Sequence, residues 1–405
     1  MKPSRRQLLT SAALIGGTGL LGLPAMLLAE GNSRRFLFLF CRGGWDVTYF
    51  FAPSFGGLVD MPEGSQAAST GDIDWVEGED RPAIRSFMDS YGQELCPING
   101  LEVRSVTHDR CQRLIMTGSS GLEADDWGAQ LAANGGSALR LPHVVVQGPS
   151  FTSQHGAHVV RVGRGGQLPA LIGGDALDGL DQPVGGPASS SAVEDLLVAR
   201  SRALAARESS LVAELAARPA EKARGLEDLD IKLDVGDQFG DQIDLALDCF
   251  EQGLSRSALV TFDGLWDSTF DTHSDNPMQG RHFDLLFEEL GRLREQLELR
   301  DLLGDTTVLV FSEMGRHPQL NDLGGKHHWT YTSALLFGAG VRGGRALGGY
   351  DESLFGQPVD LASGEVHGAG TLMVAGHLGA TILALGGLDP QEHLGLDAIQ
   401  AVIAL

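Results

Sequence analysis

The chain has 405 residues, 55 of them glycine, and a formal net charge of −23. A chain of this length can bury a full hydrophobic core, in one large domain or in one domain with insertions. The acidic balance argues against a nucleic-acid partner, because phosphate binding needs a basic surface. By itself it indicates only a well-solvated surface. We therefore expect a loop-rich α/β protein that binds no nucleic acid.

The first 29 residues have the pattern of an export signal. Arg5 and Arg6 precede a mildly apolar, glycine-rich run from Leu8 to about Ala29. Paired arginines before such a run are typical of twin-arginine signals, which export folded proteins. The run is also just long enough to be a transmembrane anchor. We predict a twin-arginine signal at 1–29, contact with the twin-arginine export machinery and a periplasmic or secreted product. Membrane attachment would come only through an uncleaved signal.

Apolar runs predict the strands of a buried sheet, at 34–41, 100–106, 143–147, 257–262, 306–311 and 334–340. Helical spacing of apolar residues predicts helices at 192–218, 281–303 and 370–387, and a shorter one that begins after Thr107. Strands that alternate with helices indicate an α/β fold with a mostly parallel central sheet. We predict one domain at 34–405 that carries a helical insertion at about 192–253.

The four cysteines, Cys41, Cys96, Cys111 and Cys249, are widely spaced. No Cys-x-x-Cys is present, which excludes a zinc ribbon and a thioredoxin-like motif. An exported protein could pair them as disulfides. Buried free thiols are the favoured interpretation.

Polar side chains follow strand after strand: Asp46, Thr107, the 263–275 loop and the 312–328 loop. Ligands of open α/β sheets bind outside the carboxyl ends of the strands. We therefore expect these four clusters to converge on one site rather than to be unrelated solvated loops.

The first two candidates come from the first half of the chain. Asp46 follows the strand 34–41 through Gly43 and Gly44, which let the backbone turn sharply. Its carboxylate could reach a ligand or merely cap a helix. Thr107 lies where a helix begins, and could be a simple cap or a hydroxyl nucleophile. The helix N-terminus would favour an anionic substrate there.

The remaining candidates lie in the two later loops. Asp271 and His273, spaced as Asp-x-His, could give a divalent ion one oxygen and one imidazole ligand. Glu313 ends the strand 306–311, and His327 and His328 follow a Gly-Gly turn, so a loop could present one of them inward. The guanidinium of Arg316 suits phosphate or sulfate. Each of these histidines could also be an ordinary surface residue, as we expect His155 and His158 to be.

Together these motifs resemble a known family. They are Gly43-Gly44-Trp45-Asp46, Phe270-Asp271-Thr272-His273, VLVFSEMGRHPQLNDLGGKHHW and LLFGAGVRGG. They resemble a bacterial family of uncharacterised exported proteins that is placed in the alkaline phosphatase/sulfatase-like superfamily. The family usually shows Trp-Asp-Thr-His, Ser-Glu-Phe-Gly-Arg-Thr-Pro and Gly-x-Asp-His-Trp. The resemblance covers essentially the mature chain and is most specific at 266–344.

The resemblance implies an alkaline phosphatase-like three-layer sandwich with a two-metal hydrolytic site. Thr107 would be the nucleophile, and Arg316 would hold anionic oxygens. The divalent ions could be zinc, manganese, magnesium or calcium, and their implied ligands are Asp46, Asp271, His273, Glu313 and His328. The implied activity is hydrolysis of phosphate or sulfate esters. The substrate would be an anionic small molecule or a polysaccharide ester.

Two other functions fit the same fold. One is a non-catalytic periplasmic binding or maturation protein, which Met314 favours because the family order implies a histidine ligand there and a thioether suits zinc or magnesium poorly. The other is a metal-dependent isomerase or phosphotransferase, against which the predicted export argues. Metal content separates hydrolysis from binding, because the two-metal mechanism requires bound ions.

Overall fold

The structure is a computed structural model, and it describes residues 34–163, 231, 235–236, 238–264 and 269–404. The predicted signal at 1–29 and the predicted helix at 192–218 lie outside these residues. In the part of the chain that is described, no helix is long and apolar enough to cross a membrane.

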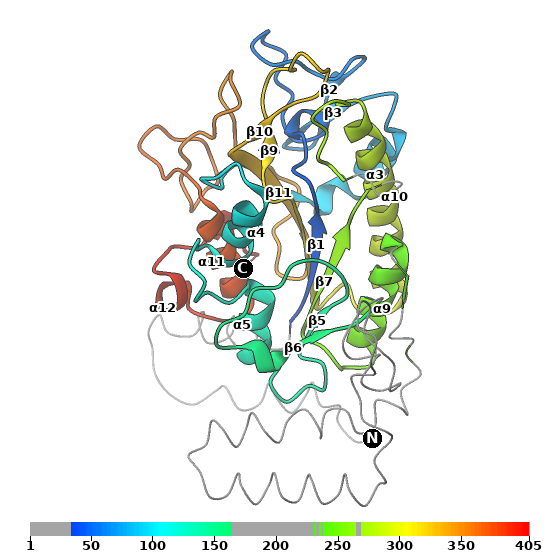
Figure 1. Ribbon diagram of the computed structural model, residues 1–405, viewed down its shortest axis with the longest axis vertical. Coiled ribbons are helices and arrows are strands. Elements are labelled where there is room, and N and C mark those ends of the chain that lie inside the picture. The colour runs from blue at the N-terminus through cyan, green and yellow to red at the C-terminus, as the bar shows by residue number, and fades with distance from the viewer. Residues whose placement is uncertain (1–33, 164–230, 232–234, 237, 265–268, 405) are drawn as a thin grey trace, which may run out of the picture.

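An eight-stranded sheet forms the centre of the molecule (Figure 1). Its strand order is β12-β4-β11-β8-β1-β7-β5-β6. Strand β11 is antiparallel to both neighbours, and the others all run in one direction. The strands are β1 (Arg35–Cys41), β4 (Cys96–Glu102), β5 (His143–Val145), β6 (Val159–Arg161), β7 (Ser257–Phe262), β8 (Thr306–Phe311), β11 (Tyr331–Gly338) and β12 (Leu347–Gly348).

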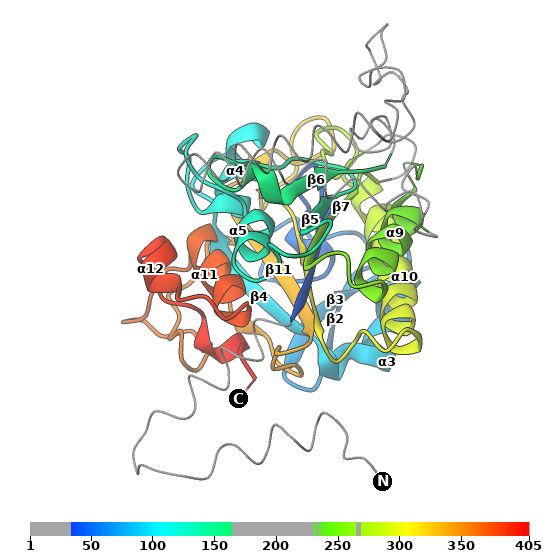
Figure 2. The same ribbon diagram turned by 90° about the horizontal axis from the view of Figure 1, so that it is seen from below.

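Helices cover both faces of the sheet. Figures 1 and 2 show α3, α9 and α10 on one side, and α4, α5, α11 and α12 on the other. Their bounds are α3 (Pro82–Tyr91), α4 (His108–Thr117), α5 (Trp127–Ala133), α9 (Phe239–Glu251), α10 (Met278–Leu299), α11 (Ala375–Leu385) and α12 (Pro390–Leu394). The predicted α/β fold, a mostly parallel sheet flanked by helices, is confirmed.

Strand β1 shows why the sheet is buried on both faces. Successive side chains of a strand point to opposite faces. Leu37 and Leu39 pack into the core under α9 and α10, whereas Phe36, Phe38 and Phe40 pack into the core under α4 and α11. A strand covered on both sides must be apolar throughout, as β1 is.

The bounds of one strand differ most from the prediction. Strand β4 spans Cys96–Glu102 rather than 100–106. It contains Pro97 and Gly100, two residue types that rarely occur inside strands, so the apolar signal began too late. Gly100 has φ +78, and a Cβ there would press on the backbone of Gly349 and Gly356. The sequence also gave no indication of the small β2 (Gln66–Thr70) and β3 (Ile73–Glu77) hairpin.

The four cysteines are all free and buried, as predicted. Burial raises the pKa of the Cys96 and Cys249 thiols to about 12 each. They are therefore inert, and the chemistry of the protein must lie elsewhere.

Candidate metal site

A sharp turn after β1 organises the site. Gly43 has φ +113 and Gly44 has φ +82, conformations that favour glycine. A Cβ on Gly43 would overlap the backbone of Phe270 and Asp271, and one on Gly44 would come within 2.8 Å of the Met314 side chain. Gly43 therefore allows the end of β1 to touch the loop that follows β7, and Gly44 allows it to pack against the segment that follows β8.

Four side chains meet beside this turn, and we call them the histidine–aspartate cluster: His108, Asp271, His273 and His328. His108 is the first residue of α4, and His328 lies in β10 (His328–Trp329), which pairs with β9 (Gly315–Arg316). The other two lie in the loop after β7. The structure thus brings together residues from three carboxyl-end segments of the sheet.

The distances within the cluster are short. Asp271 Oδ2 lies 3.3 Å from His108 Nε2, and Asp271 Oδ1 lies 3.2 Å from His273 Nε2 and 3.5 Å from His328 Nε2. The Nε2 atoms of His273 and His328 are 2.9 Å apart. His108, Asp271 and His328 each offer one ligand atom within 4.8 Å of the others. This group can hold a metal ion.

Hydrogen bonds on the far side of two rings fix which nitrogen faces the cluster. His108 Nδ1 donates to Glu313 Oε1 at 2.8 Å, and His328 Nδ1 donates to the carbonyl of Val106 at 2.7 Å. When these rings are neutral, their Nε2 lone pairs point to Asp271, and Nε2 is the atom that could bind a metal ion. His108 Nε2 is buried and makes no hydrogen bond of normal geometry within the described residues. A metal ion could bind this nitrogen. The two imidazoles and the carboxylate therefore form a set of ligands that fits a cation.

Glu313 lies behind His108. Its carboxylate is fully buried and accepts the N–H groups of Gly43 and Gly44, the Ser312 hydroxyl and the His108 ring. A carboxylate that orients a histidine ligand in this way fixes its tautomer and raises its basicity. The Glu313 carboxylate therefore contacts the cluster through the His108 ring.

Arg316 is also turned toward the protein. Its buried guanidinium donates to the carbonyls of Gly43, Gly44 and Lys326 and to Asp271 Oδ1, the last at 2.6 Å. Four of the five N–H groups of an arginine are thereby used. In this structure the guanidinium holds Asp271 and the β1 turn in place.

These contacts shape the charge of the cluster. Burial opposes ionisation of Asp271, but its contacts with the nitrogen atoms of His108, His328 and Arg316 outweigh this effect and hold its pKa far below the usual range. The contacts with Asp271 and Glu313 raise the pKa of His108 to about 9, so a metal ion that binds Nε2 would replace a proton there. Burial and the Arg316 charge lower the pKa of His273. The site is thus a carboxylate with a lowered pKa, surrounded by the ring nitrogens of three histidines.

Asp46 does not join the cluster. Its fully buried carboxylate forms an ion pair with Lys326, with 2.8 Å between Oδ2 and Nζ. The carboxylate also accepts from Thr48 and caps the short 3-10 helix Val47–Tyr49. The helix-capping alternative therefore describes its local role.

Thr107, Met314 and His327 are not members of the cluster. Thr107 is the N-cap of α4, is exposed, and places its Oγ1 3.2 Å from Ser105 Oγ. It lies in the chain between Val106, whose carbonyl accepts from His328, and His108, which belongs to the cluster. Met314 is buried in the hydrophobic core, and His327 is exposed.

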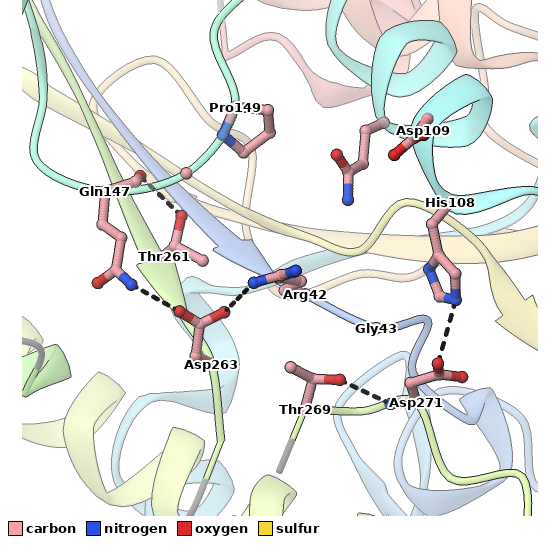
Figure 3. A pocket seen from close by; sticks show the side chains of 12 residues that line it. Arg42, Gly43, His108, Asp109, Gln147, Pro149, Thr261, Asp263, Thr269 and Asp271 are labelled. Atoms are coloured by element: carbon pink, nitrogen blue, oxygen red, sulfur yellow. Dashed lines mark hydrogen bonds and ion pairs between the residues drawn. The ribbon is translucent and has the colours of Figure 1, made fainter. Parts of the chain in front are cut away.

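A polar pocket of about 390 Å³ opens beside the cluster, and His108 and Asp271 form part of its wall (Figure 3). The other side chains that line it are mostly polar: Arg42, Asp109, Gln112, Gln147, Thr261, Asp263 and Thr269, with Pro149. Gln147 Nε2 donates to Asp263 Oδ2 at 2.7 Å, and Arg42 lies 3.6 Å from the other oxygen. The pocket presents hydrogen-bonding groups next to the candidate metal position.

Sequence reasoning missed His108 and Lys326. His108 directly follows Thr107 at the start of the helix, so both residues occupy the position expected for a site residue. The prediction named Thr107 because its hydroxyl could act as a nucleophile. Lys326 precedes the two adjacent histidines and gave no signal of its own, since a lysine in a polar loop is ordinarily solvated.

The fold and this cluster define an α/β protein with a candidate metal site at the carboxyl edge of its sheet. A model of the family described as "Protein of unknown function (DUF1501)" matches residues 199–395, slightly less than half of the chain. No curated protein matches the chain significantly.

Several solved structures are similar to the chain. Ps i-CgsB, in complex with k-i-k-neocarrahexaose, has 9% identity and a TM-score of 0.44 over 91% of this chain and 75% of its own. The PsFucS1 sulfatase from Pseudoalteromonas sp. has 11% identity and a TM-score of 0.41 over 91% and 72%. A protein in the alkaline phosphatase superfamily from Vibrio parahaemolyticus has 10% identity and a TM-score of 0.37 over 95% and 78%.

Proposed function

We propose that the protein is an exported, metal-dependent hydrolase of phosphate or sulfate esters. The observation that carries the proposal is the convergence of His108, Asp271, His273 and His328 through their Nε2 and carboxylate atoms. The sequence resemblance of the loops after β7 and β8 to the alkaline phosphatase/sulfatase-like superfamily supports the class of reaction.

The donor set favours a transition metal. Imidazole ligands suit zinc and related ions, whereas magnesium and calcium prefer oxygen donors. Among the ions considered, zinc or manganese therefore fits the cluster better than magnesium or calcium. When bound, such an ion supplies a Lewis acid that polarises an ester oxygen.

The residues around the cluster would orient the ligands. Glu313 holds the His108 ring through Nδ1, and the Val106 carbonyl holds His328. Arg316 holds Asp271 and clamps the β1 turn at the same time. The N-terminus of α4, where His108 lies, favours anionic oxygens through its backbone dipoles.

The pocket would receive the alcohol part of the ester. Its amide, carboxylate and hydroxyl groups can exchange hydrogen bonds with a hydroxylated substrate, and its lining is more polar than apolar. This supports an anionic small molecule or a polysaccharide ester as the substrate.

Thr107 is our candidate nucleophile, because it lies in the chain between His108, a member of the cluster, and Val106, whose carbonyl contacts His328. The test is hydrolysis of 4-nitrophenyl phosphate and 4-nitrophenyl sulfate by the zinc- or manganese-loaded protein. Thr107→Ala should lower kcat by on the order of 1,000-fold, whereas Thr107→Ser should retain activity. Equal activity of wild type and Thr107→Ala would exclude this nucleophile.

A binding protein is the second candidate, because the donors of Arg316 are already used by the protein. It predicts bound metal without hydrolysis of either ester. The same assay therefore decides between the two functions.

We also propose export by the twin-arginine route, from the sequence of residues 1–29. Replacing both Arg5 and Arg6 by lysine should leave the protein inside the cell, as measured by cell fractionation. Unchanged export of that variant would contradict the route.

A further inference from the structure

We propose that the site holds one divalent ion per chain, and that the ammonium group of Lys326 neutralises Asp46 where a two-metal site would need a second ion. This inference rests on the proposed metal site and concerns how many ions that site takes. It departs from the two-metal arrangement that the sequence resemblance implies.

Asp46 has no free position for a metal. An ionised carboxylate offers about four lone-pair sites. Oδ1 accepts from the Thr48 N–H at 3.1 Å and the Thr48 hydroxyl at 2.7 Å. Oδ2 accepts from Lys326 Nζ at 2.8 Å and from Asn276 Nδ2 at 3.1 Å. All four sites are therefore occupied by protein donors.

Backbone hydrogen bonds hold Lys326 beside Asp46. Its N–H donates to the Thr272 carbonyl at 3.2 Å, and its own carbonyl accepts from Arg316 at 3.1 Å. Its side chain is fully buried, and Nζ also lies 3.3 Å from Thr48 Oγ1. The ammonium group thus cannot swing into solvent without leaving Asp46 behind as a buried, unpaired charge.

Binding of a metal ion at Asp46 would leave the Lys326 ammonium group without its partner. It would have to displace Lys326 and Asn276, and the displaced ammonium would stay buried beside a divalent ion. The ion pair between Asp46 and Lys326 leaves neither the carboxylate nor the ammonium group buried without a partner. Lys326 also lies two residues before His328, so the pair ties the end of β1 to the loop that carries this ligand.

Metal counting tests the inference. The full chain would be loaded with zinc, freed of excess, and weighed by native mass spectrometry, with elemental analysis as a check. We expect one ion in the wild type, one in Asp46→Asn, and a loss in His328→Ala. Two ions in the wild type and one in Asp46→Asn would overturn the inference. No ion in the wild type would instead overturn the proposed metal site.

Thermal unfolding without metal gives an independent readout. In the presence of a chelator, Asp46→Asn and Lys326→Met should each lower Tm by about 5 to 10 °C, because each leaves one buried partner alone. The double variant should lose less than the sum of the two. If Asp46→Asn lowers Tm only when zinc is present, Asp46 is a metal ligand and the inference is wrong. The wild-type metal count decides the matter if Lys326→Met does not fold.

Discussion

Histidines lie beside carboxylates at both edges of the central sheet. At the amino edge, His143 begins β5, Ser257 begins β7 and Asp126 caps α5. His143 Nδ1 donates to Ser257 Oγ at 2.9 Å, and its Nε2 lies 3.8 Å from Asp126 Oδ1. These are the residue types of a hydrolytic triad, yet none of the three is more than 1% exposed.

The carboxyl edge uses similar residues in a different way. His108, His328 and Asp271 keep 29%, 20% and 38% of their side-chain surface exposed, and the pocket opens beside them. At the amino edge the Ser257 hydroxyl is spent on the Gly128 carbonyl at 3.0 Å. At the carboxyl edge the Nε2 atom of His108 has no hydrogen-bond partner of normal geometry among the described residues. The two clusters therefore differ in solvent access and in the presence of a ring nitrogen without a hydrogen-bond partner, although their residue types are similar.

The largest expected effect is loss of metal at the carboxyl edge. Asp271→Ala and His328→Ala should each weaken zinc binding by more than about 100-fold, since each removes a direct ligand. His155→Ala, a histidine outside the cluster, should bind as the wild type does. Titration with a competing chelator measures all three, and equal affinities would remove our assignment of the ligands.

Low pH should destabilise the fold through two buried histidines outside the site, His143 and His282. Burial lowers the pKa of His143, and it lowers that of His282 to about 4. Below pH 6.5 these two histidines bind more protons in the unfolded chain than in the folded one. Their contribution to the free energy of unfolding is therefore fully present above pH 6.5 and is lost as the pH falls toward 4. His282 alone should account for about 3 kcal/mol.

Urea unfolding between pH 7 and pH 4.5 measures this loss in metal-free protein. His282→Gln should show a shallower pH dependence, because its amide does not titrate. If the two pH profiles run parallel, His282 is not the group responsible.

Glu313→Gln should sharpen the comparison at the carboxyl edge. The variant keeps the size of the side chain but weakens the hydrogen bond that orients His108. We expect zinc affinity to fall by about 10- to 100-fold while the fold is kept. A drop as large as that of Asp271→Ala would instead make Glu313 a direct ligand, as the sequence suggested.

Ser257→Ala should have the smallest effect, and only on stability. It leaves His143 Nδ1 and the Gly128 carbonyl without their partner, at a cost of about 1 to 2 kcal/mol in the free energy of unfolding. Zinc affinity and ester hydrolysis should not change. Loss of hydrolysis without loss of stability would mean that the amino edge, not the carboxyl edge, carries the chemistry.

Much of the fold could be predicted, because buried parallel strands leave a strong signal. The apolar runs placed β1, β7 and β8 to within a residue, and the polar loops after them pointed to the carboxyl edge of the sheet. Strand β4 was displaced because proline and glycine interrupt it. Asp271, His273 and His328 do lie together, as their positions after the strands suggested.

The finer arrangement of the site could not be predicted, because it depends on which way side chains turn. At Thr107 and His108 the sequence cannot say which of two neighbours faces inward. Glu313 follows a strand as a ligand would, but the N–H groups of the β1 turn hold it behind His108. The pairing of Asp46 with Lys326 joins segments far apart in the chain, and a charged pair of this kind leaves no local pattern.

The most direct test of the account is the position of the metal in crystals of the zinc-loaded protein, located by anomalous scattering at the zinc absorption edge. We predict one strong peak per chain, about 2.0 to 2.2 Å from the Nε2 atoms of His108 and His328 and a carboxylate oxygen of Asp271. A peak at Asp46, or no peak in the histidine–aspartate cluster, would contradict the account.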